Sequence, residues 1–250
     1  MKERKLEKYI SEHSSPEDPV LEDLFRQTHL RFVNPNMASG FLQGRFLEMI
    51  TRMIDPVTVL EIGTYTGYST ISIAKGLSEK GKIITIETDD ELADFARSYF
   101  IKAAVENKII QYTGNAIDII PGLEQEFDLV FIDGDKREYC DYYRVLINKV
   151  RKGGFILADN VLWGDKVLDK DSRDQQTRGI IDFNEMLMHE SDIEHVILPL
   201  RDGITIIRKI LQLWKHYAYP LPSSFRLPTS DFRLQPSFWY TFCSFIENYI

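Results

Sequence analysis

The chain has 250 residues and a formal net charge of −8, with 44% hydrophobic and 27% charged residues, which suits one domain with a substantial core. The acidic balance argues against broad electrostatic binding to nucleic acid or to an anionic membrane. The charged start MKERKLEKYI, the lack of an apolar run of membrane-spanning length, and two distant cysteines, Cys140 and Cys243, predict a cytoplasmic protein in a reducing compartment.

Residues 1–55 are expected to form helices that cover a cofactor site. A short charged helix is expected at Met1–Ile10 and a second within Pro16–Phe32, with Ser15 as its N-cap. The apolar stripe that follows predicts a third helix. Met37 lies in the loop ahead of the first predicted strand, where a loop can fold over a cofactor bound at the end of that strand.

The stretch from Val57 to Ala74, VTVLEIGTYTGYSTISIA, reads as a buried strand, a glycine turn and a helix. Gly63 lets the backbone approach a ligand where a Cβ would collide, and the helix after Gly67 offers unpaired N–H groups. The next predicted strand ends in Glu87, about twenty residues after the turn, where an acid can hold a ribose diol. Together these features predict a nucleotide-type α/β site.

Strands and helices then alternate regularly, which predicts a Rossmann-like, doubly wound and mostly parallel sheet of seven strands. The last two strands meet at a short turn and are expected to pair as an antiparallel hairpin. The helices expected after the turn are 90–104 with Asp89 as its cap, a short one closed by Pro121-Gly122, 137–150 and 178–189, with a turn at 151–154. The strands expected are 82–87, 109–112, 127–132, 155–158, 193–198 and 204–208.

Residues 211–250 do not fit this alternation. They are rich in aromatic residues and in proline, and prolines prevent long helices. The segment can be an irregular tail on its own domain, a dimer contact, or a sequence not selected for this fold. We therefore divide the chain into a domain of residues 1–210 and a tail of residues 211–250 with no assigned role.

Acidic residues follow two of the predicted parallel strands directly. Asp133 and Lys136 follow one strand, and Asp159 and Asn160 follow the next. If the first strand lies beside the fourth and the fourth beside the fifth, these residues converge with the glycine turn at one edge of the sheet. Their hard oxygen ligands suit Mg²⁺ that keeps waters or takes substrate oxygens. The alternative, helix capping by the carboxylates, has about even odds.

With these motifs, the chain resembles the class I cation-dependent O-methyltransferases, the family of catechol and caffeoyl-coenzyme-A O-methyltransferases, in its short bacterial form. The resemblance spans about residues 17 to 209. Asn115 stands where that family more often has Asp, and the family normally ends near Ile210. The motifs that carry it are Met37-Ala38-Ser39, Leu42-Gln43-Gly44, 60–69, Gly114-Asn115-Ala116, 131–136 with Tyr139, Gly153-Gly154, 159–164, Thr177-Arg178, Phe183-Asn184, and Leu198-Pro199-Leu200 through Gly203-Ile204.

The resemblance implies S-adenosylmethionine and a divalent cation, Mg²⁺ or another, as cofactors. It implies that Gly63, Tyr65 and Ser69 hold the amino-acid end of the cofactor, with Met37 and Glu61 nearby, Glu87 on the ribose, and Asn115 with Ala116 on the adenine. Asp133, Asp159 and Asn160 would bind the metal, Asp133 would also face the cofactor's amino group, and Lys136 matches the candidate base. For Met37 and Tyr65, simple packing in the wall is an equal alternative.

The expected activity is methyl transfer to a catechol-like small phenol, by a homodimer with no membrane partner. The alternative acceptor is a hydroxylated uridine in transfer RNA, against which the acidic net charge counts mildly. A cofactor-binding interaction protein without catalysis is less favoured, because both the metal-ligand residues and Lys136 are present.

Overall fold

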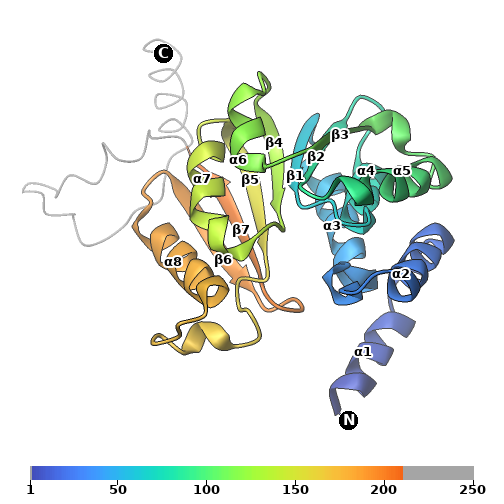
Figure 1. The fold of residues 1–250 in the computed structure, drawn as a ribbon, viewed down its shortest axis with the longest axis horizontal. Coiled ribbons are helices and arrows are strands. Elements are labelled where there is room, and N and C mark those ends of the chain that lie inside the picture. Colours follow the sequence, from blue (N-terminus) through green and yellow to red (C-terminus); the bar gives the residue numbers. More distant parts are fainter. Residues whose placement is uncertain (1, 211–250) are drawn as a thin grey trace, which may run out of the picture. The chain divides into compact units, whose positions relative to one another are not determined.

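The computed structural model describes residues 2–210, which form a seven-stranded sheet with helices on both faces (Figure 1). The expected tail, 211–250, lies outside the described residues. The strands are β1 Thr58–Ile62, β2 Lys82–Glu87, β3 Ile109–Thr113, β4 Phe127–Ile132, β5 Val150–Asp159, β6 Ile193–Leu198 and β7 Ile204–Lys209. The α-helices are α1 Lys2–Glu12, α2 Pro19–Arg31, α3 Gly40–Ile54, α4 Tyr68–Gly76, α5 Ala93–Lys102, α6 Ala116–Ile119, α7 Tyr139–Leu146 and α8 Gln175–His189. Single 3₁₀ turns include η1 Pro35–Met37 and η5 Lys136–Glu138.

The strand order is β3-β2-β1-β4-β5-β7-β6. β1 pairs in parallel with both β2 and β4, and β4 pairs in parallel with β5. β7 pairs antiparallel with β5 and with β6. The predicted fold class, the position of the first strand beside the fourth, and the carboxy-terminal hairpin are therefore confirmed. The strand order reverses beside β1, so the carboxyl ends of β1 and β4 lie at the switch point.

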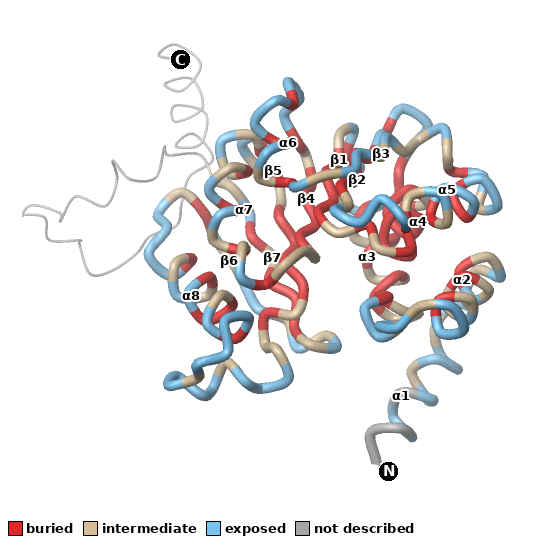
Figure 2. Tube along the Cα trace, in the orientation of Figure 1, coloured by how far each residue is buried: buried red, intermediate tan, exposed pale blue. Residues whose placement is uncertain are grey.

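Alternate side chains of the central strands pack into two separate hydrophobic cores, one on each face of the sheet. Leu60 and Ile62 of β1 pack with α6, α7 and α8, whereas Val59 packs with α2, α3, α4 and α5. This is the period of two that a strand imposes on its side chains, and a sheet covered on both faces has strands that read as continuous apolar runs. Figure 2 shows the buried strands at the centre and the exposed outer surfaces of the helices.

The N-cap of α2 is Asp18, so the expectation of Ser15 was wrong. Asp18 accepts a hydrogen bond from the N–H of Val20, and Pro19 occupies the first turn of the helix. A helix capped by Ser15 would place Pro19 in its interior, where the ring clashes with a carbonyl of the preceding turn and one helical hydrogen bond is lost. The favourable position for proline is the first helical residue, and this decides where α2 begins.

The expected turn at 151–154 is wrong as well, because these residues belong to β5. Their pairing with β4 shifts register between Phe127 and Leu129, and Gly153 has φ +78°. The glycines therefore mark a β-bulge, in which extra residues of one strand oppose fewer residues of its partner. Helix α7 ends at Leu146 instead of continuing to 150, and Val150 already pairs with Phe127 of β4. Helix α8 begins at Gln175, earlier than expected, because Asp174 caps it through the N–H of Thr177.

Candidate active site

A cavity of about 940 Å³ lies at the carboxyl ends of the parallel strands. It is lined by the turn after β1, the ends of β2, β4 and β5, and the segment 33–39 ahead of α3. The predicted site residues that line it are Met37, Gly63, Tyr65, Ser69, Glu87, Asn115, Ala116, Asp133, Lys136, Asp159 and Asn160. The tertiary structure thus brings together residues that the sequence distributes over more than a hundred positions.

Gly63 has a backbone conformation that side chains rarely adopt. Its φ is +97°, and a Cβ built there would lie 2.2 Å from the carbonyl oxygen of Asp133. The turn after β1 therefore lies directly against the end of β4. A glycine is needed at this position for both reasons, φ and space. The close approach keeps the first turn of the site in contact with the acidic end of β4.

Glu87, at the end of β2, holds the backbone of that turn. Its Oε2 accepts from the N–H of Tyr65 at 2.7 Å, and its Oε1 accepts from the N–H groups of Thr88 and Asp89 at 2.8 and 3.1 Å. Oε2, which among the described residues accepts only from the N–H of Tyr65, has a further lone pair for a ligand hydroxyl. The carboxylate is therefore fixed at the cavity wall and is still able to accept hydrogen bonds.

Glu61 is buried beneath the cavity and does not line it. Its Oε2 accepts from Thr70 and Thr85 at 2.5 and 2.7 Å, and its Oε1 has no hydrogen-bond partner among the described residues. Burial, opposed by these hydroxyl donors, raises the pKa of Glu61 to about 7. The structure thus places Glu61 behind the glycine turn as a supporting group.

Asn115 caps α6, with its side-chain oxygen accepting from the N–H of Ile117 at 2.8 Å. Any hydrogen bond from a cofactor to this amide oxygen would have to use its second lone pair. Elsewhere in the cavity wall, Tyr65 donates from its hydroxyl to the carbonyl of Asn34 at 3.2 Å. This contact joins the glycine turn to the segment that carries Met37, and Met37 itself is 57% exposed.

Lys136, Asp133 and Tyr139 form a connected polar group between the ends of β4 and β5. The Lys136 ammonium donates to Asp133 and to the Tyr139 hydroxyl, both at 2.8 Å. Tyr139 donates in turn to the backbone carbonyl of Asp159 at 2.9 Å. Burial and the neighbouring carboxylates raise the pKa of Tyr139 well above its usual value, so its hydroxyl keeps its proton. Tyr139, a motif residue without an assigned role, links the two strand ends.

Asp159 is almost fully buried, with 2% of the residue exposed. Its carboxylate accepts from Gln43 at 2.6 Å and from the N–H of Asn160 at 2.8 Å. Burial, followed by the negative charge of Asp133, raises the pKa of Asp159 to about 7. A carboxylate that is desolvated and repelled in this way gains from a nearby cation.

The oxygen ligands of Asp133, Asp159 and Asn160 fit a divalent cation such as Mg²⁺, because hard cations take carboxylate and amide oxygens and keep several waters. Asn160, with φ +58°, follows Asp159 in a left-handed conformation at the cavity wall. Within residues 2–210 no group of three or more His, Cys, Asp or Glu could hold a metal ion by itself. The donor set is therefore suited to an ion that also binds water or substrate.

A family model described as O-methyltransferase matches residues 11–210. The chain belongs to this O-methyltransferase family. It is 37% identical over 172 residues to the catechol O-methyltransferase of Niastella koreensis, covering 67% of this chain and 75% of that protein. It is 31% identical over 218 residues to the caffeoyl-CoA O-methyltransferase of Petroselinum crispum, covering 82% of this chain and 90% of that protein. The expected family and enzyme class are thus confirmed.

Two solved structures of O-methyltransferases support the same assignment. TomG from Streptomyces achromogenes, involved in tomaymycin synthesis and determined in complex with SAM, superposes with a TM-score of 0.78 and 32% identity, covering 82% of this chain and 96% of that one. The Bacillus cereus O-methyltransferase in complex with SAH superposes with a TM-score of 0.75 and 29% identity. The match covers 82% of this chain and 97% of that one. In this O-methyltransferase, no helix of residues 2–210 has the length and apolar character needed to cross a membrane.

Gln43 and Arg201 reach the site without having been predicted for it. Gln43 touches Asp159 from α3, and Arg201 lines the cavity from the turn between β6 and β7. Gln43 belongs to a motif of the resemblance, which was the available signal. For Arg201 the only available signal was its place in the Arg201-Asp202-Gly203 turn.

Proposed function

We propose that this chain transfers the methyl group of S-adenosylmethionine to one hydroxyl of a catechol-like small phenol, with Mg²⁺ held by Asp133, Asp159 and Asn160. The observation that carries the proposal is the convergence of Lys136 with the acidic ends of β4 and β5 in the cavity that also holds the glycine turn. Relatives named for catechol and caffeoyl-CoA as acceptors support this class of acceptor.

The glycine turn and Glu87 are proposed to hold the cofactor. The turn leaves room for the amino-acid end of S-adenosylmethionine, with Tyr65 and Ser69 beside it. Glu87 accepts from the ribose hydroxyls, and Asn115 with Ala116 forms the wall beside the adenine. The SAM and SAH complexes of the structural neighbours support the placement of a cofactor in this fold.

Lys136 is proposed to act on the acceptor oxygen. A phenol with a pKa of about 10 is mostly protonated at neutral pH. A bound Mg²⁺ would favour the deprotonated form of a chelated vicinal diol. The Lys136 ammonium lies beside Asp133 and can hold the anionic oxygen, or accept its proton once neutral.

Trp163 supplies an apolar wall of the kind that an aromatic acceptor needs. It lines the cavity, and its buried indole N–H has no hydrogen-bond partner among the described residues. An aromatic acceptor ring gains from such a flat apolar surface.

The test is transfer of an isotopically labelled methyl group to catechol and, separately, to transfer RNA that carries hydroxylated uridine. Each assay is run with and without chelator. Labelling of catechol that is lost with chelator and restored by Mg²⁺ is the expected result. Labelling of transfer RNA alone would overturn the acceptor class, and full activity in chelator would overturn the metal. We also propose a homodimer, for which light scattering should give twice 29.1 kDa.

A further inference from the structure

Arg201 connects the turn between β6 and β7 to the start of α3. Its Nη1 donates to the carbonyl of Ser39 and to the side-chain oxygen of Gln43, and its Nη2 lies 3.5 Å from the carbonyl of Ala38. All three partners belong to the segment that covers the cavity or begins α3. Arg201 thus links the carboxy-terminal hairpin to this segment by hydrogen bonds.

Gln43 contacts both Arg201 and Asp159 through its side-chain amide. The guanidinium of Arg201 can only donate, so the amide oxygen of Gln43 must face it. The amide nitrogen then faces Asp159, to which it donates at 2.6 Å. Gln43 is fully buried, so water cannot replace Arg201 or Asp159 as a hydrogen-bond partner of its amide. Arg201 therefore determines which end of the Gln43 amide meets the carboxylate.

The backbone of Arg201 indicates that its side chain is needed where it lies. Arg201 has φ +51°, in the left-handed region that favours glycine. A residue with a β-carbon is strained in this conformation, and surrounding contacts must offset the strain. The hydrogen bonds to Ser39 and Gln43 are contacts that a glycine could not make.

We propose that Gln43 is a positioning residue that holds the Asp159 carboxylate for the metal, and that Arg201 acts through Gln43 by fixing its amide. This inference rests on the proposed function, in which Asp159 is a metal ligand. One lone pair on each Asp159 oxygen is used by Gln43 and by Asn160, which leaves the others for a cation. Groups that orient a metal ligand in this way affect metal affinity although they do not touch the metal.

The test measures Mn²⁺ binding, as a probe of the site, to the metal-free full-length protein by electron paramagnetic resonance of the free ion. The variants are Gln43→Leu, Arg201→Met and the double variant. Gln43→Leu should lower Mn²⁺ affinity about 10–100-fold. Arg201→Met should lower it by a smaller factor, and the double variant should match Gln43→Leu, because Arg201 acts through Gln43.

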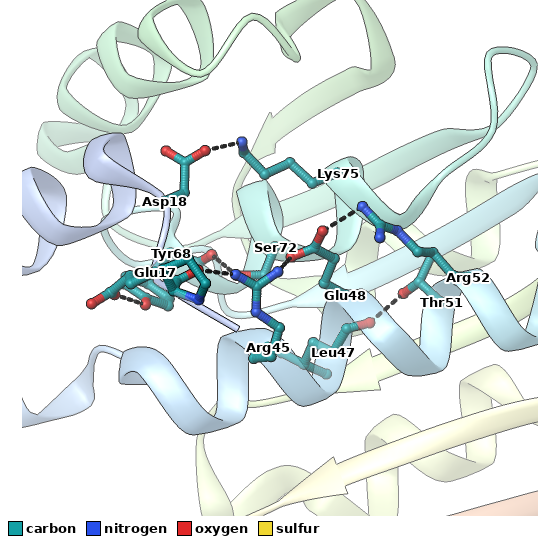
Figure 3. Close-up of polar contacts among 11 residues, drawn as sticks. Glu17, Asp18, Arg45, Leu47, Glu48, Thr51, Arg52, Tyr68, Ser72 and Lys75 are labelled. Carbon is teal, nitrogen blue, oxygen red and sulfur yellow. Dashed lines mark hydrogen bonds and ion pairs between the residues drawn. The ribbon is translucent and has the colours of Figure 1, made fainter. Parts of the chain in front are cut away.

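Arg45→Met is the matched control. Arg45 is also a partly buried arginine, and it lies on α3 only two residues after Gln43. It donates to Glu48 at 2.7 Å (Figure 3). It also donates to the carbonyl of Pro16. It therefore fastens an amino-terminal segment without contacting the site, and Mn²⁺ affinity should stay within about twofold of the wild type. S-adenosylhomocysteine affinity, measured by calorimetry, should likewise be retained in Gln43→Leu.

Unchanged Mn²⁺ affinity in Gln43→Leu would overturn the inference while leaving the metal site intact. Losses that add in the double variant would overturn the role of Arg201, because additive effects indicate independent action. If the wild type binds no Mn²⁺, the proposed metal site fails and the inference fails with it. If Gln43→Leu does not fold, Arg201→Met decides: a loss of threefold or more supports the inference, and a smaller one overturns it.

Discussion

Lys136 and Asp159 lie in one connected group, yet their removal should have different consequences. Lys136 is 7% exposed and donates to Asp133, whereas Asp159 is held by Gln43 and by its own neighbour Asn160. In the proposed function one acts on the acceptor oxygen and the other holds the metal. The difference can be measured in the turnover and in the metal affinity of single variants.

Lys136→Met should lower kcat by about 10²–10⁴-fold, the usual range for a lost general acid–base group, without lowering Mg²⁺ affinity. Asp159→Ala should instead lower Mg²⁺ affinity, and excess Mg²⁺ should restore part of its activity. Steady-state kinetics over a Mg²⁺ titration separates the two effects. The deficit of Lys136→Met should shrink with catechols whose hydroxyl is already acidic. Rescue of Lys136→Met by Mg²⁺ would show that the roles are wrong.

Glu87→Gln should weaken S-adenosylmethionine binding by a factor that corresponds to about 1.5–3 kcal/mol, because a charge-assisted acceptor for the ribose hydroxyls is lost. Glutamine keeps the length of the side chain and one oxygen for the N–H of Tyr65. Isothermal calorimetry gives the cofactor affinity, and Mn²⁺ affinity is the control that should not change. Equal cofactor affinity in both proteins would refute the role of Glu87.

Among the elements, the turn between β1 and α4 is the least tolerant of change. It combines two glycines with positive φ, Gly63 and Gly67, and it lies between the end of β4 and the side chain of Phe100. The strand before it and the helix after it are both buried. The turn is therefore packed on both sides, and its backbone cannot move to accommodate a larger side chain.

Gly63→Ala should destabilise the protein by about 2–6 kcal/mol, since strain at positive φ and overpacking each contribute on the order of 1–3 kcal/mol. The added Cβ would meet the Asp133 carbonyl at 2.2 Å. Gly122→Ala is the matched control, because nothing lies within 4 Å of a Cβ there. Urea unfolding of both variants measures the difference. A Gly63→Ala protein as stable as Gly122→Ala would contradict the packing described.

At the scale of the whole molecule, two buried acids make stability depend on pH. The pKa of Asp159 and that of Glu61 are each raised to about 7, from 3.8 and 4.5. Between the usual pKa of each acid and its raised pKa, the folded chain keeps a proton that the unfolded chain releases. The free energy of unfolding of the metal-free protein should therefore fall as pH rises from about 4 to about 7.

Asp159→Asn should make this fall less steep, because one of the two acids no longer titrates. Thermal unfolding in chelator at several pH values compares the two slopes. Mg²⁺ should then stabilise the wild type above about pH 7 more than the variant, since a ligand that binds the folded state stabilises it. If the stability of both proteins changed equally with pH in chelator, Asp159 would be ionised over the whole range from about pH 4 to about pH 7.

Truncation after Ile210 should leave a protein that unfolds cooperatively and binds S-adenosylmethionine, because both the family match and the last strand end by then. Lys209 still donates to the carbonyls of Ile147 and Val150, which fixes the end of β7. Chemical unfolding and calorimetry of the shortened and full-length chains make the comparison, with light scattering for the oligomer. Loss of both folding and binding would show that 211–250 completes the core.

Much of the sheet and of the site could be predicted because the signals are local in the sequence. β2, β4 and β6 have the expected bounds. The apolar runs of β2 and β4 end at acidic residues, and β6 ends before Pro199. The carboxyl ends of parallel strands meet at one edge, so Asp133, Asp159 and Glu87 could be placed from their positions alone.

The tertiary structure decided what depends on contacts between distant parts of the chain. The bulge in β5 follows from its pairing with β4, which no local glycine pattern specifies. The alternation along β1 turns Glu61 away from the cavity, although the next residue, Ile62, lines it. Gln43 and Arg201 are separated by 158 residues and meet only because α3 packs beside the hairpin turn. A single sequence records each of these side chains but not the packing that joins them.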